Sequence, residues 1–157
     1  MQQITPFLWF DANAEEAVNF YVSVFKDAKI ISTARYGEAG PGPAGSVMTM
    51  KFQLDGTEFV ALNGGPHFAF SPAVSFVINC ETQSEVDHYW DQFGKDGKPM
   101  QCGWITDRFG VTWQVTPTIL PKLLQDKDRA KANRVMQAMM KMVKLDIPTF
   151  ERAYNAD

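Results

Sequence analysis

Hydrophobic and polar positions follow the same order twice along the chain. A short apolar run rich in aromatic residues predicts a strand at residues 7–10, and a second strand is predicted at residues 73–79. Each run is followed by apolar residues at helical spacing, which indicate an amphipathic helix with one buried face. These helical stripes are Ala17, Phe20, Tyr21 and Val24 in the first copy and Val86, Tyr89, Trp90 and Phe93 in the second.

The two predicted helices begin with the same signal. Asn13 is followed three residues later by Glu16, and Thr82 is followed three residues later by Glu85. This spacing is typical of a capping box, in which the two side chains satisfy free backbone N–H groups. Thr82 lies 69 residues after Asn13, and the same offset relates the two apolar stripes. The sequence therefore contains an internal repeat.

Extended segments follow each helix. In the first half they are residues 29–36, 47–54 and 57–63, and in the second half residues 100–106 and 111–116. Asp55-Gly56 predicts a hairpin turn, and Asp107–Gly110 predicts a type I turn. We expect an α+β fold of two βαβββ modules with curved mixed sheets, helices on the convex side and a cavity on the concave side. One module alone could not bury its own apolar face.

The pattern changes after Pro117. Asp128 can cap a helix from Arg129 to about Val143, and Asp146 with Pro148 can start another. The methionine-rich face of the first helix indicates a core or subunit interface, or a ligand surface, because methionine adapts to irregular shapes. We expect a single domain over residues 1–157, with modules at about 4–63 and 73–117 and a helical tail at about 118–157.

Composition excludes several partners. The chain has 157 residues and a net charge of −3, without a basic run, so we expect no nucleic-acid partner and no membrane. The first residues lack a signal-peptide pattern, and two cysteines form no disulfide framework. We therefore expect a cytoplasmic protein with reduced thiols.

Several blocks of sequence resemble a known family. They read ITPFLWFD, AEEAVNFYVSVF, ALNGGPHFAF, CGWITDRFGVTWQVTP and AMMKMVKLDI. With the repeated βαβββ pattern, they resemble the PhnB-like branch of the vicinal-oxygen-chelate (glyoxalase, bleomycin resistance and dioxygenase) superfamily. Members of this branch often carry the label 3-demethylubiquinone-9 3-methyltransferase.

The sequence does not support the methyltransferase label. A common S-adenosylmethionine enzyme needs a parallel α/β sheet whose first turn is rich in glycine and opens a helix. Gly64-Gly65-Pro66 follows a predicted strand but opens no predicted helix, and Gly37–Gly45 lies between two predicted strands.

The resemblance also predicts where a metal would bind. Metal-dependent relatives use His and Glu side chains at positions that match Thr5, Ala73 or Val74, and Gln114 of this chain. A hydroxyl, an alkyl group and a neutral amide are poor substitutes for such ligands. We therefore expect no metal and no cofactor.

The same resemblance implies a small-molecule pocket on the concave face. The residues expected to line it are Thr5, Trp9, Asn63, His67, Phe68, Trp104 and Gln114. Trp113 should point the other way into the core, while Trp104 can be either a cavity wall or a second core tryptophan.

Two functions remain open. The first is a metal-free small-molecule-binding protein, expected to be a homodimer because two-fold dimers are common. The second is an enzyme of the same superfamily, with isomerase, lyase or transferase chemistry, that uses His67 or Cys102. His67 can otherwise be held by turn hydrogen bonds.

Overall fold

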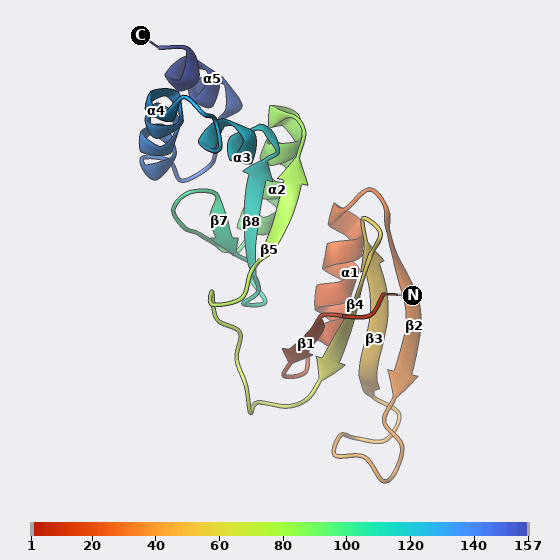
Figure 1. Cartoon of the computed structure of the whole chain (residues 1–157). Helices are drawn as coiled ribbons and strands as arrows, with labels where there is room; N and C mark the ends of the chain where they lie inside the picture. The colour runs from red at the N-terminus through yellow and green to blue at the C-terminus, as the bar shows by residue number, and fades with distance from the viewer. Residues whose placement is uncertain (1, 157) are drawn as a thin grey trace. The chain divides into compact units, whose positions relative to one another are not determined.

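The computed structural model describes residues 2–156, which form two compact units that divide between Phe70 and Ser71. Each unit contains a four-stranded sheet and a helix packed on it (Figure 1). Unit 2 also carries the three helices of the C-terminal tail. The expected α+β fold of two βαβββ modules with a helical tail is confirmed.

Unit 1 has the strand order β1-β4-β3-β2. β1 and β4 run parallel, whereas β4, β3 and β2 are antiparallel neighbours. The elements are β1 (Phe7–Phe10), α1 (Ala14–Val24), β2 (Ala28–Arg35), β3 (Val47–Leu54) and β4 (Thr57–Asn63). The Asp55-Gly56 turn joins β3 to β4, as predicted.

The core of unit 1 lies between α1 and one face of its sheet. Tyr21 of α1 is fully buried and stacks on Phe52 of β3, with ring centroids 6.3 Å apart. Phe52 in turn stacks on Phe59 of β4 at 5.4 Å. The predicted helical stripe therefore faces the sheet, except that Phe20 is only half-buried at its edge.

The start of α1 differs from the prediction. The Asn13 side chain makes no capping hydrogen bond. Instead, Asn63 at the end of β4 accepts a hydrogen bond from the Ala14 N–H through Oδ1 at 2.8 Å. A side chain distant in sequence thus caps the helix, which a local motif cannot reveal.

Unit 2 repeats the topology of unit 1, with the strand order β5-β8-β7-β6 and a parallel β5–β8 pair. Its elements are β5 (Phe76–Cys80), α2 (Gln83–Gly94), β6 (Lys98–Pro99), β7 (Trp104–Thr106) and β8 (Thr112–Pro117). Both β5 and α2 begin 69 residues after β1 and α1, as the internal repeat predicts. Thr82 accepts from the Glu85 N–H, so this cap is confirmed.

The core of unit 2 lies between α2 and the sheet. Trp113 is buried and stacks on Phe93 of α2, with centroids 4.9 Å apart, as predicted. The buried Asp107 carboxylate accepts hydrogen bonds from the Trp113 indole and from the N–H groups of Phe109 and Val111. The predicted turn at Asp107–Gly110 is therefore present, closed by a hydrogen bond from the Gly110 N–H to the Asp107 carbonyl and stabilised by the Asp107 carboxylate.

The predicted strand at residues 100–106 is interrupted. Of this segment only β7 (residues 104–106) is extended, because residues 101–103 form a turn, and β6 lies just before the predicted segment. Cys102 and Gly103 both have positive φ values, 59° and 82°, which a strand does not allow.

The tail contains one helix more than predicted. α3 (Ile119–Leu124), α4 (Arg129–Met140) and α5 (Ile147–Asn155) share a small apolar core around Leu120, Val135, Leu145 and Phe150. Asp128 and Asp146 cap α4 and α5, as expected. α4 ends at Met140 rather than near Val143. The N–H groups of Cys102 and Gly103 donate to the carbonyls of Met142 and Val143, so these two residues pair with the turn of the sheet and do not continue the helix.

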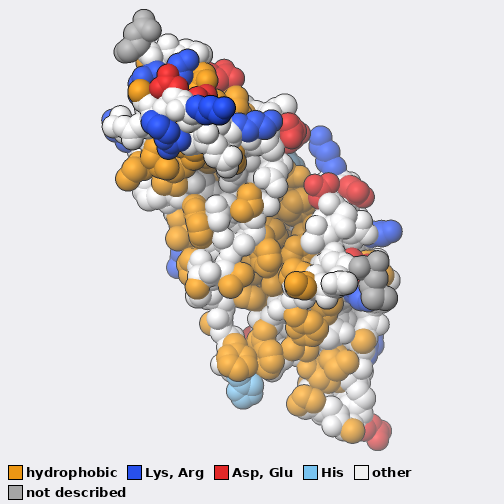
Figure 2. All heavy atoms as spheres, viewed as in Figure 1, with side chains coloured by type: hydrophobic (Ala, Val, Ile, Leu, Met, Phe, Trp, Pro, Cys, Tyr) orange, Lys and Arg blue, Asp and Glu red, His pale blue; other side chains and the backbone are white. Residues whose placement is uncertain are grey.

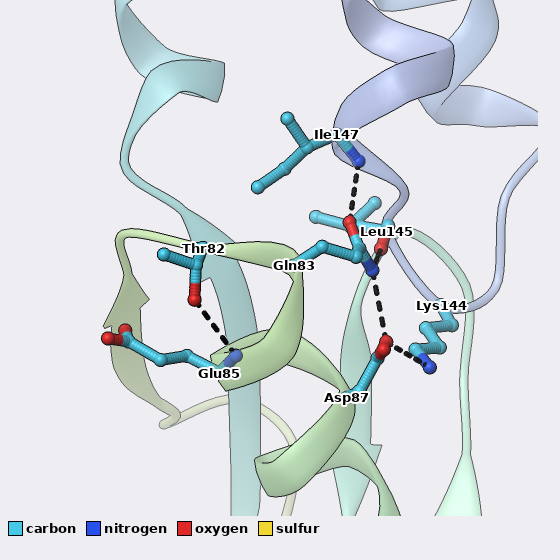
Figure 3. Close-up of polar contacts among 7 residues, drawn as sticks. All are labelled: Thr82, Gln83, Glu85, Asp87, Lys144, Leu145 and Ile147. Carbon is cyan, nitrogen blue, oxygen red and sulfur yellow. Dashed lines mark hydrogen bonds and ion pairs between the residues drawn. The ribbon is translucent and has the colours of Figure 1, made fainter.

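A polar cluster anchors the tail to α2 (Figure 3). The Gln83 amide donates to the Leu145 carbonyl at 3.1 Å and accepts from the Ile147 N–H at 2.8 Å. Gln83 also donates to Asp87, which forms an ion pair with Lys144. This pair and the Gln83 hydrogen bond hold the pKa of the Asp87 carboxyl below its usual value. The predicted helix start at Asp146 is thus held by a residue more than 60 positions earlier.

No helix within residues 2–156 is long and apolar enough to cross a membrane. Lysine and arginine side chains gather over the C-terminal helices in the view of Figure 2.

Candidate binding pocket

The Gly64-Gly65-Pro66 turn continues the pairing between β1 and β4. The Gly64 N–H donates to the Phe10 carbonyl at 2.8 Å, and the Gly65 N–H donates to the Asp11 carbonyl at 3.0 Å. Gly65 has a φ of +91°, which favours glycine. The turn opens no helix, and residues 37–46 lie in a loop between β2 and β3. Neither glycine-rich segment therefore has the geometry of a cofactor-binding first turn.

Trp9 explains why position 64 of this turn, like position 65, requires glycine. Its indole N–H donates to the Gly65 carbonyl at 2.9 Å. A Cβ atom on Gly64 would lie 2.3 Å from the Trp9 ring. Phe68 packs edge-on against the same indole, with centroids 5.0 Å apart. Trp9 is thus fixed by its contacts to the turn.

Tyr36 organises the glycine- and proline-rich loop that follows β2. Cβ atoms on Gly40 and Gly42 would lie 2.8 Å and 2.4 Å from opposite edges of the Tyr36 ring, so the loop wraps closely around it. The Tyr36 hydroxyl donates to the Asn63 carbonyl. Backbone hydrogen bonds from Tyr36 to Ser46 and from Gly45 to Tyr36 close the base of the loop.

A pocket of about 450 Å³ lies between this loop and the glycine turn. It is lined by residues 11–12, Tyr36, residues 41–43, residues 46–47 and residues 63–67. Within residues 2–156, the side chains of Asp11 and His67 have no hydrogen-bond or ion-pair partner. The pocket therefore combines apolar walls with two polar groups that are available to a ligand.

The structure brings only part of the predicted site of unit 1 into this pocket. Asn63 and His67 line it, whereas Thr5, Trp9 and Phe68 do not. Thr5 is half-buried just before β1, and Phe68 is 67% exposed.

Asn63 also lies on a different face of the sheet from Trp9. Leu8 and Phe10 are buried toward α1, so Trp9 lies on the opposite face by strand alternation. Asn63 pairs with Phe10, and its amide is held by the Ala14 N–H and the Val47 carbonyl. The expectation that Asn63 and Trp9 share one face is therefore wrong, because Asn63 caps α1.

In unit 2, Trp104 and Gln114 lie side by side. They are paired across β7 and β8, and paired residues present their side chains on the same face. Ile105 and Trp113 are the next pair and lie in the helix-covered core. Trp104 is therefore on the face opposite α2 and is not a second core tryptophan.

Gln114 has a partner on this face. Its side-chain amide donates to the Ser75 hydroxyl at 2.9 Å. Gln114 and Trp104 are both half-buried, and their neighbour Val77 on β5 is 49% exposed. Unit 2 thus presents an indole, an amide and an alkyl side chain on the sheet face that α2 does not cover.

The two cysteines have different environments. Burial, with a smaller contribution from Glu85, raises the pKa of the Cys80 thiol to about 12. Cys102 is half-buried and its thiol donates to the Met139 carbonyl at 3.6 Å. With the backbone hydrogen bonds from Cys102 to Met142 and from Gly103 to Val143, this contact attaches the tail to the sheet of unit 2.

The donor set does not fit a divalent metal. In the part of the chain that the structure describes, no three His, Cys, Asp or Glu residues are grouped closely enough to hold one. Thr5, Ala73 or Val74, and Gln114 stand at the positions that the resemblance assigns to ligands, and the Gln114 amide is bonded to Ser75.

Sequence reasoning missed Asp11, Tyr36 and Ser46 as lining residues. The signal for Tyr36 was present, because an aromatic residue directly before a glycine- and proline-rich loop indicates a ring around which the loop can pack. No local pattern indicated that Asp11 lines a pocket, because its position beside the glycine turn depends on the pairing of β1 with β4.

Two βαβββ units, each with a parallel strand pair at one edge of its sheet, define a glyoxalase-like fold related to the vicinal-oxygen-chelate superfamily. A family profile described as 3-demethylubiquinone-9 3-methyltransferase matches residues 2–116. The chain belongs to this 3-demethylubiquinone-9 3-methyltransferase-like (PhnB) family.

Solved structures agree with this assignment. A Bacillus cereus structure named for PhnB and for 3-demethylubiquinone-9 3-methyltransferase is 39% identical, with a TM-score of 0.69, and the match covers 74% of this chain and 100% of that chain. A Pseudomonas aeruginosa protein is 22% identical, with a TM-score of 0.62, over 74% of this chain and 98% of that one.

A more distant structure shares the fold alone. The fosfomycin resistance protein FosX from Mesorhizobium loti is 15% identical, with a TM-score of 0.50, over 72% of this chain and 90% of that one. The comparison with curated proteins found no match.

Proposed function

We propose that this protein binds a small, partly apolar molecule without a metal ion. The observation that carries the proposal is the pocket of unit 1, whose volume of about 450 Å³ falls in the usual range for ligand sites. Its loops are fixed by Tyr36 and by the glycine turn, so the pocket is preformed. Members of the related superfamily bind small molecules.

A pocket-filling variant tests this proposal. Ala12 is exposed and lines the pocket, so Ala12→Trp places an indole there without entering the core. Ala44→Trp is the control, because Ala44 is exposed in the neighbouring loop and does not line the pocket. Native mass spectrometry of protein purified from expressing cells should show a bound small molecule in the wild type and in Ala44→Trp. It should be absent from Ala12→Trp, and its retention there would place binding elsewhere.

Elemental analysis tests the metal-free part. The expected result is no stoichiometric nickel, zinc, iron or manganese, because an amide, a hydroxyl and an alkyl group replace charged or basic donors. About one metal per chain, lost in Gln114→Ala, would contradict it.

We further propose that the faces opposite the helices contribute to ligand binding. In unit 1 this role would fall to Thr5, Trp9 and Phe68, and in unit 2 to Trp104 and Gln114. The exposed aromatic ring of Phe68 and the half-buried Trp104–Gln114 pair support it.

An enzyme of the same superfamily is the second candidate. His67 supports it, because its exposed imidazole lines the pocket and can transfer a proton near neutral pH. In the alternative route Cys102 would act as a nucleophile, although its thiol donates a hydrogen bond to the Met139 carbonyl. Conversion of a bound compound that is lost in His67→Ala but kept in Cys102→Ser would establish the first route.

Finally, we propose that residues 1–157 work as one domain and as a homodimer in the cytoplasm. The exposed Met136, Met140 and Val143 support a subunit contact, and two unpaired cysteines suit a reducing compartment.

A further inference from the structure

We propose that the pocket of unit 1 selects a molecule that carries a protonated amine on a compact apolar body. This inference rests on the proposed function, since it names the ligand class of the same pocket. Three features support it. The pocket is lined by one carboxylate and by no lysine or arginine, the nearby Arg35 and the start of α1 are already hydrogen-bonded within the protein, and the walls are apolar.

Asp11 supplies the charge. Of the residues that line the pocket, Asp11 is the one with a full charge at neutral pH, and no lysine or arginine lines it. The Asp11 backbone is fixed by the hydrogen bond from Gly65. Its carboxylate has no partner within residues 2–156, so a ligand ammonium group would not have to displace a protein cation.

Arg35, at the end of β2 just before the loop, is directed to another acceptor. Arg35 donates to the Gly45 carbonyl at 3.0 Å and does not line the pocket. Residues 1–70 as a whole carry seven carboxylates and four basic side chains, a net charge of −3. A field of this sign raises the local concentration of cations.

The start of α1 does not offset this preference. A helix N-terminus normally attracts anions through its free N–H groups. Here the Asn63 amide oxygen accepts from the Ala14 N–H at 2.8 Å, and Glu15 and Glu16 occupy the first turn. The helix end beside the pocket therefore offers little to a carboxylate or phosphate.

The remaining walls suit an apolar body. Tyr36, Pro41, Pro43 and Val47 contribute ring and alkyl surface around the polar groups. His67 is neutral or positive but never negative, so it can accept or donate a hydrogen bond without adding to the anionic charge. The pocket thus has one anionic position against an apolar wall.

Three probes of similar shape test the inference. Phenethylamine, phenethyl alcohol and phenylacetate differ chiefly in the charge of the polar group. They are titrated against the full chain by ¹H–¹⁵N NMR at low salt and at about pH 8, where an ordinary imidazole is largely neutral. The variants are Asp11→Asn and the control Glu38→Gln, which removes an exposed loop carboxylate that does not line the pocket.

The amine should bind about threefold to fivefold more tightly than the alcohol, the size expected of a partly exposed ion pair, and phenylacetate should bind least. Asp11→Asn should remove the advantage of the amine, and Glu38→Gln should retain it. Equal binding of amine and alcohol at the pocket, or tightest binding of phenylacetate, would overturn the inference and leave the proposed function standing. An advantage that survives in Asp11→Asn would also overturn it. Absence of shifts at the pocket with all three probes in the millimolar range would count against both.

Discussion

At the residue scale, Asn63 and the two glycines after it each hold a separate part of unit 1 in place. Asn63 caps α1 through its side chain and receives the Tyr36 hydroxyl at its carbonyl. Gly64 leaves room for Trp9, and Gly65 accepts the Trp9 indole hydrogen bond. Of these three residues, Asn63 was predicted to line a pocket. Their structural roles could not be predicted, because each depends on a partner at least 27 positions away.

Gly64→Ala should destabilise the protein by about 1–3 kcal/mol, because a Cβ atom there overlaps the Trp9 ring, which is held by its own hydrogen bond. Gly37→Ala is the control, since a Cβ atom on Gly37 meets nothing within 4 Å. Its free energy of unfolding should change by no more than about 0.5 kcal/mol. Urea unfolding measures both, and equal values for the two variants would contradict the close packing of Trp9.

The two thiols should react at different rates. Cys80 is fully buried and its pKa is raised to about 12, so its thiolate is scarce at neutral pH. A chromogenic disulfide reagent should therefore modify one thiol per chain in the folded protein and two after denaturation. Cys102→Ser should abolish the native reaction, whereas rapid modification of Cys80 in that variant would contradict its burial.

At the element scale, the internal repeat predicted the fold well. The apolar stripes and the 69-residue offset placed β1, α1 and α2 correctly, because these signals are local and occur twice, whereas the strand expected at residues 73–79 is β5 at Phe76–Cys80. The break between β6 and β7 and the early end of α4 were not predictable. Both depend on the same long-range backbone hydrogen bonds between residues 102–103 and 142–143.

The tail anchor gives a prediction at this scale. Gln83→Ala removes hydrogen bonds to the Leu145 carbonyl and the Ile147 N–H, and leaves them without that partner beside a buried core. We expect a loss of about 1–3 kcal/mol and faster hydrogen exchange in α5. Gln92→Ala is the matched control in α2, where, among residues 2–156, the side chain accepts only from the exposed Lys95. Unchanged exchange in α5 of Gln83→Ala would contradict the anchoring role.

At the scale of the whole molecule, the helices of the tail and the residues of the pocket were the parts that the sequence predicted least well. The helical tail was predicted, but α3 was not, because its six residues are too few to show a periodic pattern. Of the seven residues predicted to bind a ligand, Asn63 and His67 share a pocket in unit 1, and Trp104 and Gln114 share a sheet face in unit 2. Periodicity assigns a residue to a face, but the closure of a loop around Tyr36 requires tertiary contacts.

The proposed homodimer can be tested through the exposed apolar side of α4. Met140 is 67% exposed, and Met136 and Val143 are partly exposed near it. Light scattering at micromolar concentration should give the mass of two chains for the wild type and for Gln137→Glu, an exposed control in the same helix. Met140→Glu should shift the mass toward one chain, because it places a charge in an apolar contact. A wild-type mass of one chain would remove the dimer.

The central claim is that unit 1 holds a preformed pocket for a small, partly apolar molecule. The most direct test is ¹H–¹⁵N NMR of the full chain against a library of small aromatic and aliphatic compounds. The account predicts that binding compounds shift the amide signals of residues 11–12, 36–46 and 63–67 together, and that Ala12→Trp but not Ala44→Trp suppresses these shifts. Binding that maps only to other residues, or an Ala12→Trp variant that still binds with the same shifts, would contradict it.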